Sequence, residues 1–176
     1  MEPIISKKDM TEEDIKHHYI TPAVTKKWSH AKITMETTIT DGQIILRGNV
    51  YSRSKGKRAD YILYLNANYP IAIIEAKDNH HGVSHGLQQA MEYARMLDLP
   101  FAYSSNGDGF AEHDFLTGRE RQFSMEEFPT EEELLARFKR ESNEGQGLTV
   151  AQEKAIGQPY YSSPTTYPPR YYQRIA

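Results

Sequence analysis

Two acidic residues and a lysine near the middle of the chain have the types and spacing of a metal-dependent hydrolase site. Asp60 stands near the start of the apolar segment RADYILYL, and Glu75 and Lys77 close the segment IAIIEAK. The turn-rich stretch NANYP separates the two segments, which predicts an antiparallel hairpin. Counting outward from this turn places Asp60 opposite residue 75 or 76, and directly opposed residues have Cβ atoms about 4.5–5.5 Å apart. The sequence therefore predicts that Asp60 and Glu75 face each other.

Two carboxylates this close repel each other unless a cation lies between them. Mg²⁺ prefers oxygen ligands and typically takes one or two carboxylates together with water and substrate phosphate. Because side chains alternate along a strand, Glu75 and Lys77 are expected on one face, while Ala76 points away and offers its backbone carbonyl as a further metal ligand. The metal would polarise a phosphoryl oxygen and lower the pKa of a bound water, which Lys77 would position or deprotonate. This chemistry is that of a Mg²⁺-dependent phosphodiesterase.

An acid-x-Lys pattern alone is common, and Asp14-Ile15-Lys16 has the same spacing. That pattern falls in a predicted helix, where residues i and i+2 do not share a face, so Lys16 is interpreted as solvated surface. Glu75 and Lys77 differ because they end a buried strand, where charged residues are rare. The alternative is that all three residues are strand-end charges without a chemical role.

The elements that must position these residues alternate between helices and strands. Thr11 caps a helix that Pro22 is expected to bend or end near Thr21. Strands are expected over 33–40, 44–51, 58–65, 71–77, 101–105 and 109–115, with a turn at Asp41-Gly42, and helices at about 85–98, capped by Ser84, and from the capping box of Thr130 and Glu133 through ELLARFKR. Strand 71–77, the following helix and strand 101–105 form a β-α-β unit, for which parallel pairing is expected.

These elements predict an α/β fold, a mixed central β-sheet flanked by helices, over residues 1–141. Residues 142–176 are rich in Gly, Pro, Ser and Tyr and are interpreted as a linker or tail. The chain has 176 residues, a formal net charge of −3 and no cysteine. The lack of cysteine excludes disulfides and thiolate metal sites and fits a reducing cytoplasm. No run of about 18 apolar residues is present, so no membrane association is expected.

The segments RADYILYL, IAIIEAK and LQQAMEYARMLDLPFAYSSNGDGF resemble the N-terminal nuclease domain of type I restriction enzyme R subunits. That domain belongs to the PD-(D/E)xK nuclease superfamily, with its restriction-endonuclease-like core, and the resemblance covers residues 11–118. It implies that Asp60, Glu75 and Lys77 are catalytic in a Mg²⁺-dependent DNA endonuclease. It also implies that Gln89 and Tyr93, as a Gln-x-x-x-Tyr pair, help to bind DNA, and that an acid of the first helix contributes. Glu12 is the assigned acid, and Glu13 is an equally close match.

The resemblance also implies partners: double-stranded DNA, and the methylation and specificity subunits of a restriction complex. The last residues, YPPRYYQRIA, resemble the opening of a helicase-type motor, in which Gln173 would contact adenine. This chain has no phosphate-binding loop, so ATP is implied only for a full-length subunit that includes the motor. Two other classes stay open: a stand-alone nuclease of the same fold in repair or phage defence, and a non-catalytic domain that binds DNA or other subunits.

Gln89 and Tyr93 are four residues apart and therefore neighbours on one helix face. The apolar stripe of that helix is offset from them, so both are expected to point toward the end of the sheet, where an amide and a phenol could donate to phosphate oxygens. A basic cluster precedes Asp60 and consists of Arg53, Lys55, Lys57 and Arg58. It would contact the DNA backbone, or else form an ordinary solvated loop.

Overall fold

The computed structural model describes residues 5–39, 44–47, 50–53 and 57–141, with the backbone alone for 44–47 and 50–53. The α-helices are α1 (Glu12–Ile15), α2 (Thr21–Thr25), α3 (Leu87–Leu97) and α4 (Glu131–Glu141). Single turns of 3-10 helix span Lys7–Asp9, His30–Lys32 and Met125–Glu127, and a π-helical segment spans Lys16–Ile20. The strands are β1 (Ile33–Thr38), β2 (Ile44–Arg47), β3 (Val50–Arg53), β4 (Arg58–Asn66), β5 (Tyr69–Ala76), β6 (Phe101–Ser105), β7 (Gly109–Asp114) and β8 (Arg119–Ser124).

Six of these strands form one mixed sheet in the order β1-β4-β5-β6-β7-β8. Strands β5 and β6 are parallel, and all the other neighbours in this sheet are antiparallel. The parallel pair is joined by α3, as the β-α-β interpretation predicted. The observed architecture therefore confirms the expected α/β fold with a mixed sheet between helices.

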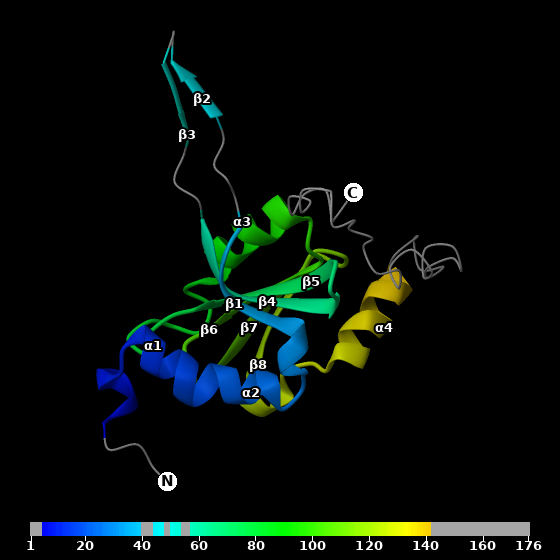
Figure 1. Cartoon of the computed structure of the whole chain (residues 1–176). Coiled ribbons are helices and arrows are strands. Elements are labelled where there is room, and N and C mark those ends of the chain that lie inside the picture. The colour runs from blue at the N-terminus through cyan, green and yellow to red at the C-terminus, as the bar shows by residue number, and fades with distance from the viewer. Residues whose placement is uncertain (1–4, 40–43, 48–49, 54–56, 142–176) are drawn as a thin grey trace.

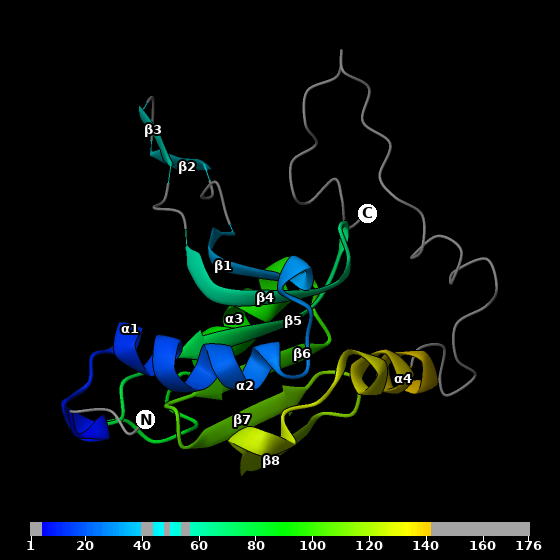
Figure 2. The same cartoon turned by 60° about the horizontal axis from the view of Figure 1, so that its bottom comes forward.

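Helices cover both faces of the sheet (Figures 1 and 2). On one face, Ile15, Ile20 and Val24 from the N-terminal helical segment and Leu134 from α4 join one buried cluster with residues of β4, β5 and β6. On the other face, the apolar side of α3 forms a second cluster with residues such as Ile62 and Ile73. The central strands are buried on both sides, which explains why RADYILYL and IAIIEAK are nearly continuous apolar runs.

The sequence predicts that Pro22 bends or ends the N-terminal helix near Thr21, and the structure shows that the helix does not end there. Thr11 caps α1 as predicted, in a capping box with Asp14. The chain then makes a π-helical turn and continues into α2, where Pro22 lies at the first positions of the helix. The π-helical turn lies shortly before the proline and changes the regular i→i−4 hydrogen-bond pattern next to the residue that has no N–H to donate. The first helical segment is therefore continuous from Glu12 to Thr25 (Figure 1).

Other boundaries also differ from the sequence predictions. Strand β1 pairs with β4, whereas β2 and β3 pair with each other in a separate two-stranded sheet. The predicted turn at Asp41-Gly42 lies outside the described residues. Helix α3 begins later than expected, with Gly86 rather than Ser84 at its N-cap. Strand β8 was not predicted, because its sequence RERQFS is polar and almost entirely exposed at the edge of the sheet.

A buried ion network attaches α4 to β7. Glu112 is 1% exposed and accepts hydrogen bonds from Arg137, Arg121 and the Tyr103 hydroxyl, and Arg137 also pairs with Asp114. Burial alone would raise the pKa of Glu112, but the hydrogen bonds from Arg137, Arg121 and Tyr103 outweigh it and lower the pKa to about 2. Glu112 is thus a fully satisfied buried carboxylate.

Among the described residues, no helix has the length and apolar character needed to cross a membrane.

Candidate active site

Asp60 and Glu75 occupy neighbouring strands of the sheet. The pairs Tyr61↔Ile74, Ile62↔Ile73 and Leu63↔Ala72 define the antiparallel register of β4 and β5, and its continuation sets Asp60 opposite Glu75. The backbone N–H of Ala76 donates to Asp60 Oδ2 at 2.8 Å, which anchors the Asp60 carboxylate against the end of β5. Both acids are buried, with 9% and 4% exposed surface. The predicted hairpin register is confirmed.

Glu75 and Lys77 meet as the period of a strand requires, because Lys77 Nζ donates to Glu75 Oε1 at 2.8 Å. The other oxygen, Glu75 Oε2, is buried and has no hydrogen-bond partner among the described residues. Burial raises the pKa of Glu75 to about 7, and the charge of Asp60 adds to this effect while Lys77 opposes it. A buried acceptor without a donor is costly and is the kind of group that a cation would satisfy.

The position of Lys77 is fixed by the strand beside β5. Its backbone N–H donates to the Ser105 carbonyl at 2.9 Å, which extends the pairing of β5 and β6 by one residue. Beyond it, Asn106 Nδ2 donates to the His81 carbonyl at 2.7 Å and holds the loop that leads to α3. Burial alone would lower the pKa of Lys77, but the hydrogen bond to Glu75 and the charges of Glu75 and Glu12 outweigh burial and raise it. In the metal-free site Lys77 therefore favours its ammonium form, which donates hydrogen bonds.

Gly86 lies where α3 approaches the same acids. A Cβ atom at this position would lie 2.9 Å from Ser104 Oγ, 3.1 Å from Glu75 Cγ and 3.3 Å from Lys77 Cε. The Gly86 N–H donates to Ser104 Oγ at 3.0 Å, so backbone and side chains are closely packed here. Only a residue without a side chain fits between α3 and the Glu75-Lys77 pair.

The acids of the first helix take different positions. Glu12 is partly buried, and burial raises its pKa, with Lys77 opposing and Asp60 reinforcing the effect. Glu13 is exposed and pairs instead with Lys16 at 2.5 Å. The charges of Lys77 and Asp60 thus influence the pKa of Glu12, while Glu13 pairs with Lys16.

Lys16 was interpreted as solvated surface, and this interpretation is wrong. Its side chain is 2% exposed, and its Nζ lies 3.2 Å from Asp60 Oδ1 and also pairs with Glu13 and Glu36. These three contacts raise the pKa of Lys16 despite its burial. The signal that could have revealed it is the i, i+4 spacing of Lys16, Ile20 and Val24, which places Lys16 on the buried face of the helix.

Gln89 and Tyr93 lie together, as their spacing predicted, with Gln89 Nε2 3.0 Å from the Tyr93 hydroxyl. The expectation that the apolar stripe leaves both of them free is wrong for Tyr93. Its ring is 8% exposed and packs in the α3 cluster with Leu87 and Leu97, and Lys57 Nζ lies over it at 5.4 Å. The offset is too small to keep a ring as large as that of tyrosine out of the core.

The basic cluster before Asp60 is only partly described. Lys57 pairs with Glu92 at 3.1 Å, and Arg58 pairs with Glu36 at 2.9 Å while remaining 65% exposed. The Arg53 side chain and Lys55 lie outside the described residues, as do Gln173 and the rest of the predicted tail. The structure therefore joins Arg58 to the site through Glu36 and leaves the DNA-contact prediction for the cluster untested.

The donor set fits a magnesium ion in part. Glu75 Oε2 is an oxygen without a donor, Asp60 faces it across the hairpin, and a carboxylate has lone pairs left after accepting one hydrogen bond on each oxygen. No three acidic or histidine side chains among the described residues form a metal-binding group. Mg²⁺ needs fewer than three protein side chains, because it keeps several water ligands and binds through one or two carboxylates. Asp60 and Glu75 would hold the ion, with the Ala76 carbonyl and Glu12 as further candidates.

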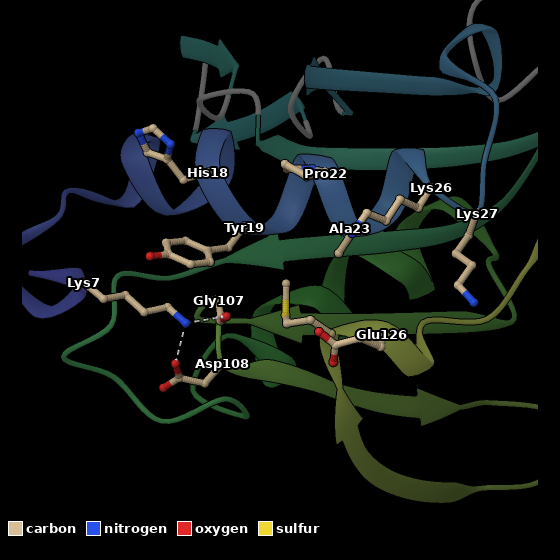
Figure 3. A pocket seen from close by; sticks show the side chains of 11 residues that line it. Lys7, His18, Tyr19, Pro22, Ala23, Lys26, Lys27, Gly107, Asp108 and Glu126 are labelled. Carbon is tan, nitrogen blue, oxygen red and sulfur yellow. Dashed lines mark hydrogen bonds and ion pairs between the residues drawn. The ribbon is translucent and has the colours of Figure 1, made fainter. Parts of the chain in front are cut away.

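A separate pocket of about 620 Å³ lies between the first helical segment and the loops at Gly107 and Met125 (Figure 3). Lys7 crosses one end of this pocket and donates to the Gly107 carbonyl and to Asp108. Gly107 has φ +86°, a conformation that a residue with a side chain rarely adopts. None of the residues predicted to carry chemistry lines this pocket.

Taken together, the mixed sheet, the helices on both of its faces, the buried Asp60 and Glu75 and the half-buried Lys77 define a restriction-endonuclease-like α/β domain. Comparison with known proteins agrees. A family model described as the second domain of the type I restriction enzyme EcoKI endonuclease subunit matches residues 48–99. The endonuclease subunit of the type I restriction enzyme EcoAI from Escherichia coli is 39% identical over 171 residues, which are 94% of this chain and 21% of that protein.

Among solved structures, a fragment described as an HsdR subunit of a type I restriction enzyme from Vibrio vulnificus YJ016 matches 94% of this chain and 31% of its own length. The match has a TM-score of 0.77 and 36% sequence identity. Over 94% of its length the chain is therefore similar to endonuclease subunits of type I restriction enzymes. It spans about a fifth of the length of the curated relative that it matches.

Proposed function

We propose that this chain is the DNA-cleaving domain of a type I restriction R subunit and hydrolyses phosphodiester bonds of double-stranded DNA with Mg²⁺. The observation that carries this proposal is the buried Glu75 carboxyl group. It lies opposite Asp60, is paired on one side with Lys77, and has one oxygen without a partner among the described residues. A group left unsatisfied in a well-packed sheet marks a functional position.

Each residue has a role that follows from its contacts. Asp60 and Glu75 bind the ion, which when bound polarises a phosphoryl oxygen and lowers the pKa of a water ligand. In hydrolysis a water attacks phosphorus while the bond to the leaving sugar oxygen breaks, so negative charge builds on the phosphate oxygens. Lys77 is an ammonium and donates a hydrogen bond to that charge or orients the water. Gln89 and Tyr93, whose amide nitrogen and hydroxyl lie 3.0 Å apart on α3, would help to bind the DNA.

The remaining parts of the proposal concern the longer protein. Methylation and specificity subunits would select the DNA site, and a motor region would use ATP, with Gln173 as its adenine contact. Arg53, Lys55, Lys57 and Arg58 would add contacts to the DNA backbone, which would make binding depend on salt concentration. The site would work in the cytoplasm, where DNA and Mg²⁺ are both present.

The test is cleavage of a plasmid that carries the recognition site, by the full-length subunit assembled with its partner subunits, Mg²⁺ and ATP. Lys77→Ala and Glu75→Gln are expected to cleave at least about 100-fold more slowly, since a positioned proton donor or metal ligand typically contributes that much or more. ATP hydrolysis should be unchanged, because the motor lies elsewhere.

Lys32→Ala is the matched control. Lys32 is also a partly buried lysine that pairs with a glutamate, Glu131. It directly precedes the first residue of β1, whereas Asp60 lies beside the second half of that strand. This variant should cleave within about twofold of the wild type, since a surface ion pair contributes little. Cleavage by Lys77→Ala at the wild-type rate would refute the catalytic assignment. Failure of all forms to cleave, with DNA and subunit binding intact, would favour a non-catalytic domain.

A further inference from the structure

Lys16 is held beside Asp60 by three carboxylates from three separate elements. Its Nζ pairs with Glu13 on α1, with Glu36 on β1 and with Asp60 on β4. An ammonium has three N–H donors, so three carboxylates saturate it. The Lys16 side chain is 2% exposed, so these carboxylates rather than bulk water surround the amine. The positive charge is therefore a fixed part of the site.

The backbone of Glu36 is bent to take part in this arrangement. Met35 pairs with Tyr61 and Thr37 pairs with Ala59, so the register sets Glu36 opposite Asp60. At that position φ is +52°, the left-handed region that a residue with a side chain occupies only at a cost. Strained backbone persists where the surrounding structure requires it and is concentrated at functional sites. Here it brings a carboxylate to the ammonium next to Asp60.

The two oxygens of the Asp60 carboxylate thus have different partners. Oδ1 faces the Lys16 ammonium, with Glu13 and Glu36 behind it, and Oδ2 accepts the Ala76 N–H at the end of β5. Glu75, whose Oε2 has no donor among the described residues, is also a residue of β5. In many sites that hydrolyse phosphodiesters, two metal ions share carboxylate ligands. In this site a cation already occupies the side of Asp60 that faces the first helix.

We infer that Lys16 is a positioning residue that replaces a second metal ion, so that the Asp60 site binds one divalent ion. This inference rests on the proposed function, because it assumes that Asp60 and Glu75 hold a metal. It assigns to Glu13 and Glu36 the task of holding the Lys16 ammonium rather than the metal.

The test is a Mn²⁺ titration of the whole 176-residue chain in the absence of DNA and nucleotide, followed by electron paramagnetic resonance and calorimetry. The wild type should bind one ion that is lost in Asp60→Asn. Lys16→Met leaves Glu13, Glu36 and Asp60 without their ammonium, and it should bind two ions. Lys16→Arg keeps a cation and should bind one.

The double variant Lys16→Met with Glu36→Gln is the control for the second ion, whose affinity should fall at least tenfold. Circular dichroism confirms that each variant is folded. Two Asp60-dependent ions in the wild type would overturn the inference, and this measurement needs no variant. A folded Lys16→Met protein with one ion would also overturn it. A wild type that binds no Mn²⁺ would refute the metal site itself, and with it both proposals.

Discussion

Glu75 is a buried carboxyl group with one oxygen that has no donor among the described residues, so its replacement by glutamine tests the electrostatics of the site without any assay of activity. The pKa of this carboxyl group rises from 4.5 to about 7 on folding, through burial and the charge of Asp60. Each pKa unit corresponds to about 1.4 kcal/mol, so the ionised form is disfavoured in the fold by roughly 3 kcal/mol. We expect Glu75→Gln to raise the free energy of unfolding of the metal-free protein at pH 8 by about 1–3 kcal/mol, since the amide still has to find partners.

The pH dependence gives the sign of the effect. Below pH 4.5 Glu75 is protonated in both the folded and unfolded states and contributes nothing. Between pH 4.5 and 7 the unfolded chain ionises first, so wild-type stability falls as pH rises, and above pH 7 the whole penalty is present. Urea denaturation in EDTA at pH 5 and pH 8 should therefore show little gain for Glu75→Gln at pH 5 and the full gain at pH 8.

Glu112→Gln is the matched control, because it changes another buried glutamate in the same sheet. The pKa of Glu112 falls from 4.5 to about 2, so its contribution to stability is present above pH 4.5 and is lost as pH falls toward 2. Breaking this buried network should cost about 3–5 kcal/mol, and the cost should be the same at pH 5 and pH 8. A Glu75→Gln protein that is no more stable than the wild type at pH 8 would refute the reasoning, as would a gain that does not change with pH.

Three further outcomes follow from the same contacts. Mn²⁺ affinity should fall about tenfold between pH 8 and pH 6, because Glu75 must lose a proton near pH 7 to bind the ion. Calorimetry at the two pH values would measure this change, and an affinity that does not depend on pH would count against Glu75 as a ligand. Gly86→Ala should lose about 1–3 kcal/mol of stability and at least tenfold in cleavage by crowding Glu75, whereas Gly82→Ala, with open space around it, should change neither. Arg137→Ala should destabilise by about 3–5 kcal/mol in urea, while the exposed Arg140→Ala should stay within about 0.5 kcal/mol; equal effects would argue against the buried network.

The hairpin that carries Asp60 and Glu75 could be predicted because its information is local. Two apolar runs and a short turn determine which residues oppose each other, and a one-residue error in register would have moved every side chain to the other face. The observed pairing of Tyr61 with Ile74 keeps the predicted register, even though the turn is shorter than the loop NANYP suggested. The β-α-β unit followed from the same kind of evidence, since the connection contains one helix.

Contacts between elements far apart in the sequence could not be predicted in this way. Lys16 reaches Asp60 across 44 residues, and its burial depends on which face of the first helix meets the sheet. The partner of β1 is β4 rather than the next segment, because the chain between them forms its own two-stranded sheet. Tyr93 lies in the core because α3 packs closely against β5 and β6. The spacing of Gln89 and Tyr93 in the sequence does not indicate how closely the helix packs.

Two buried glutamates in one sheet illustrate how the fold separates stability from function. Glu112 accepts from two arginines and a tyrosine, and its low pKa shows that folding favours its charge. Glu75 accepts from a single lysine, keeps one oxygen without a described donor, and has a raised pKa because folding opposes its charge. The well-connected carboxylate holds α4 to β7, so a further ligand would gain little there. The poorly connected one keeps an oxygen that an added cation can use, and for this reason the less satisfied glutamate is the one that we assign to the metal.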